Sequence, residues 1–494
     1  MSNLLKFSIA PAVEATEAPP IPRAQAWGRE YLNSPTYGDL LDLSQGVPKN
    51  APHPSVLEAL AGSSSDPLSA RYGPILGELA LREAYAEEIR VQYQLPSSSS
   101  SSSTTSTSQF TKDTAKSVPG STSNQDGSAQ TPHQDISKGK GTVNFDDFSI
   151  TTGCNMAFLV LIMALCPSGN SSVMIPLPSY FNQMMVFSLQ GVKPIYIPGD
   201  SMNGFKPDIQ AARNYLSDVN EQGKPKMIVL VSPNNPTGAV YSHEELKEWY
   251  DLAKKHGMAL VLDETYRDFV EDEQGGRGVP HRLFEEEDWR ETLVCLGSFS
   301  KGYRIPGHRL GSIIASPALL KHVTTISDCM QICAPRPPQI ALSPLLPTLR
   351  SDLEESSKAL SHRRHLFVDV VNQVQGWKVT SIGGYFAYVS FPKEYIHASA
   401  NVGLKRKRLG SEDISLILAK RFGVVTLPGS FFMPDLKDDE IWEKDVLKGG
   451  EGLREDIWLR FAVANVGDEV ILKLGPRLEE MNKLMGIGEL SKTE

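Results

Sequence analysis

Short apolar runs alternate with amphipathic helical stretches through the middle of this chain. Seven of these runs read as buried strands: Phe148–Thr151, Ser172–Ile175, Pro194–Ile197, Met227–Val231, Met258–Leu262, Thr292–Leu296 and Leu310–Ala315. Strands that alternate with helices form a largely parallel sheet with helices on its faces. The pattern therefore predicts an α/β fold with a mostly parallel seven-stranded sheet sandwiched by helices.

One of the intervening helices is marked at both ends. Ser242 and Glu245 have the spacing of a capping box, and apolar residues recur at helical spacing from Leu246 to Ala253. Gly257 then closes the helix, because glycine readily takes the left-handed conformation found after a last turn.

The C-terminal third has a different pattern. A long amphipathic helix begins near Asp352, and the segments Gly383–Val389 and Ile457–Ala462 then alternate like antiparallel strands with one covered face. We expect a smaller α+β domain here. Residues 1–50 are expected to form an N-terminal arm and part of this domain, 51–345 the large domain, and 346–494 the rest of the small one.

Residues 96–141 differ from both domains. Pro96 is followed by seven serines and then by a Ser/Thr-rich polar stretch with almost no apolar residues. Such a segment cannot build a core, so we predict a disordered insertion in a surface connection.

Composition narrows the possible functions. The formal charge is −9 over 494 residues, which argues against a nucleic-acid binder. The basic cluster Lys405–Arg408 reads as a solvated loop rather than a nuclear localisation signal.

Five cysteines, odd in number and mostly in apolar runs, fit a reducing compartment and suggest no metal site. No leader or membrane-spanning run is recognised, so a cytoplasmic location without membrane contact is expected.

The segment Ser298–Gly311 carries the most chemistry. Lys301 follows a predicted strand, with Ser298 and Ser300 at the strand's C-terminal end, where α/β sheets bind ligands. Arg309 carries a permanent positive charge and can donate two parallel hydrogen bonds, which suits a phosphate group. A lysine beside a phosphate site suggests a Schiff base to a phosphorylated aldehyde, whereas the plain alternative is a polar surface loop.

Two neighbouring strands end in residues that would suit the ring of such a cofactor. Asp263 follows one strand and can keep a pyridine nitrogen protonated, so that the ring accepts electrons from a substrate carbanion. Tyr266 and Asn235 can both hydrogen-bond a ring oxygen. Each residue alone also fits a turn or a helix cap.

Two further loops complete the candidate site. Thr151–Ala157 forms a turn into an apolar helix, where Gly153, Cys154 and Asn155 present backbone amides that bind phosphate well. An aromatic residue after the next strand can lie flat on a pyridine ring, and Tyr180 is favoured over Phe181.

Taken together, these segments resemble fold-type I pyridoxal-phosphate enzymes of the class I/II aminotransferases, which include aminocyclopropane-carboxylate synthases and carbon–sulfur lyases. The resemblance covers nearly the whole chain apart from the insertion. It implies that Lys301 forms the internal aldimine with pyridoxal 5'-phosphate. It also implies that Arg309 binds the phosphate together with Ser298 and Ser300.

The same resemblance assigns the other positions. Asp263 is similar to the aspartate at the pyridine nitrogen, Tyr266 to the tyrosine at the ring oxygen, and Tyr180 to the stacking aromatic. Asn235 matches the asparagine of the family's Asn-Pro motif, which we also expect to face the substrate. The turn carries Cys154-Asn155 where many relatives have a small residue and a Gln or Thr.

Three positions emerge mainly from the family comparison. Gly46, in Leu43–Pro48, resembles the glycine whose backbone touches the substrate carboxylate. Tyr72 resembles the tyrosine that reaches across a dimer interface to the partner's phosphate, which implies a homodimer with shared sites. Arg460 resembles the arginine that clamps the α-carboxylate, and its alternation with apolar neighbours already places it on the opposite strand face.

The family implies a ping-pong transfer of an amino group from an L-amino acid to a 2-oxo acid. The lysine would act as general base once the incoming amino acid displaces it. Nothing matches the second arginine that dicarboxylate-specific members use, which makes aspartate a less favoured substrate. Two alternatives remain: a lyase or aminocyclopropane-carboxylate-synthase-like enzyme on the same fold, and a non-catalytic regulatory protein that keeps this fold.

Overall fold

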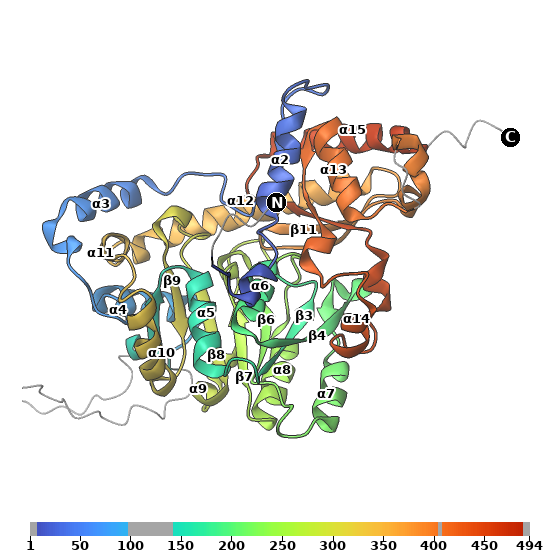
Figure 1. The fold of residues 1–494 in the computed structure, drawn as a ribbon. Coiled ribbons are helices and arrows are strands. Elements are labelled where there is room, and N and C mark those ends of the chain that lie inside the picture. Colours follow the sequence, from blue (N-terminus) through green and yellow to red (C-terminus); the bar gives the residue numbers. More distant parts are fainter. Residues whose placement is uncertain (1–6, 97–141, 404–407, 488–494) are drawn as a thin grey trace, which may run out of the picture.

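A computed structural model describes residues 7–96, 142–403 and 408–487, and its largest element is an eight-stranded sheet (Figure 1). The order across the sheet is β2-β9-β8-β7-β6-β3-β4-β5. Neighbours from β8 to β4 are parallel, whereas β9 is antiparallel to both of its neighbours and β5 to β4. The strands are β2 (Phe148–Thr151), β3 (Ser172–Leu177), β4 (Lys193–Asp200), β5 (Lys206–Pro207), β6 (Met227–Val231), β7 (Ala259–Asp263), β8 (Leu293–Ser298) and β9 (Gly311–Ile314).

All seven predicted strands are therefore present in a mostly parallel sheet, as the pattern of apolar runs predicts. The eighth strand, β5, has only two residues and lies at the edge, so it leaves no periodic signal in the sequence. The marked helix is α8 (His243–Lys255), and both halves of its capping box form between Ser242 and Glu245.

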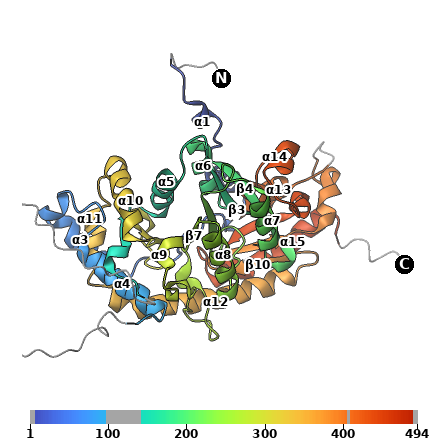
Figure 2. The same cartoon turned by 90° about the horizontal axis from the view of Figure 1, so that it is seen from below.

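Helices cover both faces of the sheet because successive strand residues point to opposite sides. In β6, Met227 and Val229 pack in one hydrophobic cluster with α5 (Cys154–Leu165) and α6 (Phe181–Gln190). Ile228 and Leu230 pack in another cluster with α7 (Ile209–Asp218) and α8. Figure 2 shows α5 and α6 on one side of the strands and α8 on the other.

The remaining helices of this part frame the sheet. They are α3 (Pro54–Ser65), α4 (Leu79–Gln92), α9 (Trp289–Thr292), α10 (Pro317–Met330), α11 (Arg336–Leu342) and the long α12 (Arg350–Asn372), which corresponds to the amphipathic helix expected near Asp352. No helix within the described ranges is both long and apolar enough to cross a membrane.

A second, four-stranded sheet has the order β10-β11-β14-β13 and is built from the C-terminal third. Its strand β11 pairs antiparallel with β14, as the alternation predicts, and α13 and α15 lie beside it (Figure 1). The elements are β10 (Lys378–Gly383), β11 (Phe386–Ser390), α13 (Ser411–Phe422), β12 (Val424–Val425), β13 (Leu427–Pro428), α14 (Asp439–Lys444), β14 (Trp458–Ala462) and α15 (Asp468–Met485).

The N-terminal segment joins this second part. After the short α1 (Pro11–Glu14), α2 (Ile21–Tyr31) packs on α13, and β1 (Leu41–Asp42) pairs parallel with β12. The domain boundaries near residues 50 and 345 stay predictions.

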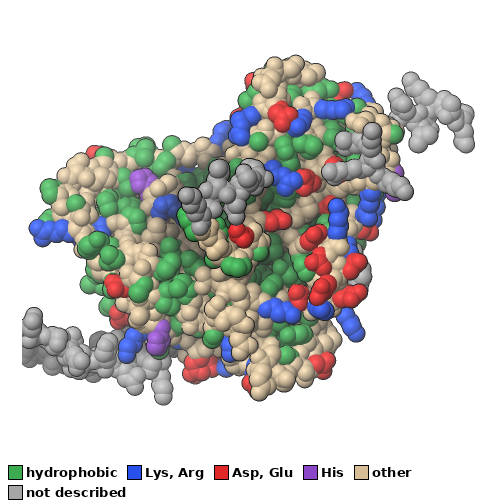
Figure 3. Space-filling model, viewed as in Figure 1, with side chains coloured by type: hydrophobic (Ala, Val, Ile, Leu, Met, Phe, Trp, Pro, Cys, Tyr) green, Lys and Arg blue, Asp and Glu red, His purple; other side chains and the backbone are tan. Residues whose placement is uncertain are grey.

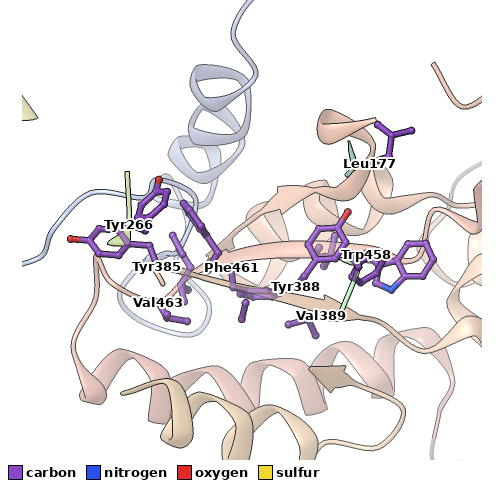
Figure 4. Close-up of a cluster of buried hydrophobic side chains, with 14 of the residues drawn as sticks. Leu177, Tyr266, Tyr385, Tyr388, Val389, Trp458, Phe461 and Val463 are labelled. Carbon is purple, nitrogen blue, oxygen red and sulfur yellow. The ribbon is translucent and has the colours of Figure 1, made fainter. Parts of the chain in front are cut away.

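Aromatic side chains connect the second sheet to the loop after β7. The Tyr266 ring centroid lies 5.1 Å from that of Tyr385 (Figure 4). It lies 5.2 Å from that of Phe386, the first residue of β11. This buried contact brings the second sheet against the C-terminal edge of the large one, where the candidate residues lie.

Two predicted segments fall almost wholly outside the described residues. Of the predicted insertion only Pro96 is described, and of the basic cluster only Arg408.

Candidate active site

Lys301 lies three residues beyond the end of β8, at the C-terminal edge of the sheet. Its Nζ donates a hydrogen bond to the backbone carbonyl of Gly46 and lies 5.6 Å from the centroid of the Tyr266 ring. Burial lowers the pKa of Lys301 to about 8, and the positive charges of Arg460 and Arg309 act in the same direction. A useful fraction of the amine is therefore neutral near pH 7 and can act as a nucleophile or base.

Asp263 is the last residue of β7 and is almost fully buried. Its Oδ1 accepts hydrogen bonds from the Thr265 backbone N–H (3.1 Å), the Thr265 hydroxyl (2.7 Å) and the Cys154 thiol (3.7 Å). Its Oδ2 accepts one from Gln183 Nε2 at 3.1 Å. Burial raises the pKa of Asp263, and the hydrogen bonds from Thr265 and Cys154 oppose that shift.

An anion cradle forms where α5 begins. Gly153 is the N-cap of this helix, with φ 84°, and Cys154 and Asn155 start its first turn. The Arg309 guanidinium lies over Gly153 so closely that a β-carbon at Gly153 would collide with Nη2. Backbone amides and a guanidinium at one helix N-terminus suit a phosphate group.

Ser298 and Ser300 lie beside this cradle at the end of β8, and both are buried. The Ser300 backbone N–H donates to the Ser298 hydroxyl at 3.2 Å. Gly311, on β9, allows the close approach of the strand, because a β-carbon there would lie 2.5 Å from the Cys154 nitrogen.

Arg460 is buried on β14, with 1% of its surface exposed. Its Nη1 donates to Asn235 Oδ1 at 2.9 Å, its Nη2 donates to the Ser44 carbonyl, and its Cζ lies 4.5 Å from the centroid of the Phe386 ring. Within the described ranges no carboxylate forms an ion pair with it, and its Nε has no hydrogen-bond partner. Burial lowers its pKa to about 10. A buried guanidinium without a counter-ion favours the binding of an anion such as a carboxylate.

Two tyrosines flank these groups. Tyr266 is 5% exposed, and burial raises its pKa well above the usual value. Tyr180 is the N-cap residue of α6, with its ring 4.8 Å from that of Phe181. Burial raises the pKa of Tyr180 to about 12, although the charge of Arg460 opposes the shift. Both phenols are therefore neutral near pH 7 and can donate hydrogen bonds.

Tyr72 is the one predicted site residue that lies outside this cluster. It is 79% exposed. Its predicted contact would be made across a dimer interface, so that role stays a prediction.

The described side chains fit a phosphorylated pyridine aldehyde such as pyridoxal 5'-phosphate. At Gly153 the Arg309 guanidinium approaches the first amides of α5 because no side chain projects there, and Lys301 offers an amine with a lowered pKa. Asp263 supplies a buried anion for a ring nitrogen. These groups come from three segments at one sheet edge: the turn after β2, the end of β7, and the connection between β8 and β9.

Sequence reasoning missed several contributors. Thr265 has a weak signal, because a hydroxyl two residues after an aspartate often closes a local turn. Gln183 and Phe386 have no signal in the sequence, because only the packing of α6 and β11 brings them to the site. Phe386 also explains Gly46: a β-carbon at Gly46 would lie 2.5 Å from the Phe386 ring.

A buried cluster of possible metal ligands lies behind the site. Single atoms of Glu264, His281 and Cys295 all lie within 4.8 Å of one another. The Leu283 backbone N–H donates to His281 Nδ1 at 3.1 Å, which places the imidazole proton on Nε2, and Nε2 faces Glu264 Oε1 at 3.3 Å. The Glu264 and His281 side chains therefore pair with each other, whereas Glu264 Oε2 has no hydrogen-bond partner among the described residues.

The chain matches the model of one protein family. Residues 144–473 match the family described as aminotransferase class I and II. The aspartate aminotransferase of Sulfolobus acidocaldarius is 27% identical over 353 residues, 71% of this chain and 78% of that protein. An aromatic aminotransferase of Arabidopsis thaliana is 28% identical over 297 residues, 60% of each chain.

Solved structures share the fold. A Thermus thermophilus aspartate aminotransferase double mutant has a TM-score of 0.71 at 19% identity, covering 96% of this chain and 99% of that one. The aromatic aminotransferase of Pyrococcus horikoshii has a TM-score of 0.67 at 20% identity, covering 93% and 99%. At these sequence identities the comparison shows a shared fold.

Proposed function

The chain belongs to the aminotransferase class I and II family and is an enzyme, and on that premise we propose how its residues carry the transfer. Lys301, with pyridoxal 5'-phosphate bound, would move an amino group between an L-amino acid and a 2-oxo acid in two half-reactions. The observation that carries the proposal is that three groups come together: the Lys301 amine and the Asp263 carboxylate at one edge of the large sheet, and the Arg460 guanidinium from β14 of the small sheet.

Each half of the cofactor has protein groups to hold it. Arg309, with the amides at the start of α5, would bind the phosphate, and Ser298 and Ser300 would add hydroxyl groups. The Tyr180 ring would lie against the pyridine, and the Tyr266 hydroxyl would donate to the ring oxygen. When bound, the cofactor supplies an aldehyde for the lysine and a ring that accepts electrons from the substrate α-carbon.

Lys301 and Asp263 would each control one proton of the reaction. The neutral Lys301 amine, favoured by burial and by the nearby arginines, would take a proton from the substrate α-carbon. Asp263 would hold a proton at the ring nitrogen, since a buried carboxylate has a strong demand for a cationic partner. The Gly46 carbonyl, which accepts from Lys301 Nζ, fixes the direction of the amine.

Arg460 would fix the substrate. Its Nη1 and Nη2 are held by Asn235 and Ser44, so the guanidinium is oriented before substrate arrives. A bidentate grip on the α-carboxylate would turn the α-carbon toward Lys301.

We also propose a homodimer in the cytoplasm. Exposed hydrophobic side chains, including Leu57, Leu68, Tyr72, Met163 and Met330, fit a surface covered by a second copy, and green side chains gather on the α3 and α5 side of Figure 3. All five cysteines are unpaired, which fits a reducing compartment.

The test is a panel of amino acids assayed with pyruvate or 2-oxoglutarate. Keto acid should form only with an acceptor, and Lys301→Ala should lose both the visible absorbance of the bound cofactor and turnover. Release of ammonia or a thiol without any acceptor would instead support the lyase alternative. Full activity in Lys301→Ala would overturn the assignment.

A further inference from the structure

The two oxygens of the Asp263 carboxylate are held very differently. Oδ1 receives three donors, from Thr265 and Cys154, and has no further room for a strong hydrogen bond. Oδ2 receives one donor, Gln183 Nε2 at 3.1 Å. Within the described residues, Oδ2 is therefore the oxygen that can still accept a proton donor from a bound ring.

Gln183 is unusual for a buried residue. It is 2% exposed on α6, and its Oε1 has no hydrogen-bond partner among the described residues. A position with only a packing role favours an apolar side chain, because an unpaired buried amide oxygen is destabilising. The contact with Asp263 is the only hydrogen bond that the side chain makes within the described ranges, so that contact accounts for the polar residue.

The local structure makes this contact specific. Tyr180 caps α6, and the Gln183 backbone N–H donates to the Tyr180 carbonyl at 3.0 Å in the first turn. The helix start thus carries Tyr180 and Gln183 together, and Gln183 reaches the end of β7. A shorter amide at this position would fall short of Asp263 by one methylene group.

We propose that Gln183 is a positioning residue that orients the Asp263 carboxylate, so that Oδ2 meets the ring nitrogen of the cofactor. This inference rests on the proposed function. A neutral amide suits the task, because it directs the carboxylate without neutralising the charge that the ring nitrogen needs.

The experiment compares Gln183→Leu and Gln183→Asn with Val186→Ala, a packing control one turn along the same helix face. The readouts are the dissociation constant of pyridoxal 5'-phosphate from the apoprotein and the absorbance spectrum of the bound cofactor at one fixed pH. The steady-state kcat and KM for an amino acid are also measured. Asp263→Asn and Lys301→Ala serve as references for a lost ring contact and a lost amine.

We expect both Gln183 variants to bind the cofactor about tenfold more weakly, as for the loss of one hydrogen bond to a charged group. Their spectrum should shift toward that of Asp263→Asn, and kcat should fall while KM stays within about twofold. Val186→Ala should keep the wild-type spectrum even if it is less stable. Two variants are used so that misfolding of Gln183→Leu leaves Gln183→Asn to decide.

Wild-type affinity and spectrum in the folded Gln183 variants, with Asp263→Asn clearly altered, would overturn the inference and leave the proposed function intact. If Asp263→Asn and Lys301→Ala also matched wild type, the proposed function itself would fail.

Discussion

Arg460 and Asn235 connect the four-stranded and the eight-stranded sheet through a hydrogen bond from Arg460 Nη1 to Asn235 Oδ1 at 2.9 Å. Arg460 lies on β14 of the small sheet, and Asn235 lies in the loop after β6 of the large one. The arginine is thereby oriented by the part of the chain that holds Lys301 and Asp263.

Replacing Arg460 with lysine should weaken substrate binding more than it affects the cofactor. Lysine keeps the charge but loses the bidentate geometry, so KM for the amino acid should rise about 10- to 100-fold. The dissociation constant of the cofactor should change little. Arg477→Lys is the matched control, because Arg477 is also a buried arginine but donates to the backbone carbonyls of Phe422 and Gly423. An unchanged KM in Arg460→Lys would contradict the carboxylate role.

The lowered pKa of Lys301 predicts how the rate of cofactor binding to the apoprotein depends on pH. The amine is protonated below its pKa and reactive above it, so the rate of reconstitution should rise with pH and level off above about 8. Arg460 is the largest charge effect on this pKa, so Arg460→Gln should move the midpoint to higher pH. Stopped-flow absorbance measures the rate, and a midpoint near the usual lysine value in wild type would refute the prediction.

The sequence predicts the large sheet well because buried parallel strands are nearly continuous apolar runs. It also predicts that Lys301 and Asp263 meet, since both follow parallel strands and such ends share one edge. Gln183 could not be predicted, because its role depends on how α6 packs against β7. Ser44 holds Arg460 through a backbone carbonyl, which any residue type supplies. The two-residue β5 is too short for any pattern.

Gly153→Ala should impair cofactor binding through a steric collision. A β-carbon there takes the place of the Arg309 guanidinium, which can move because it ends a flexible, exposed side chain. The cation would then leave the start of α5, so affinity for the cofactor should fall about tenfold. Gly169→Ala is the matched control: its φ is also positive, at 76°, but nothing lies within 4 Å of the position that a β-carbon would take there. Both variants should lose about 1–3 kcal/mol of stability from the strained backbone. Thermal unfolding and cofactor titration separate the two effects. Equal affinities would show that the collision is harmless.

The proposed dimer with shared sites can be tested by complementation between subunits. Tyr72 is 79% exposed in its own chain, so its side chain is available for a contact with the phosphate site of a second copy. Tyr72→Ala and Lys301→Ala homodimers should each be impaired. A heterodimer of the two contains one intact site, in which the Tyr72→Ala chain supplies Lys301 and the Lys301→Ala chain supplies Tyr72. Unfolding and refolding a one-to-one mixture should therefore restore about a quarter of wild-type activity, because about half of the dimers are mixed and each has one working site. Tyr72→Ala mixed with itself is the control for refolding alone. A mixture that is no more active than the average of its parents would place Tyr72 outside the site and remove the main argument for a shared one.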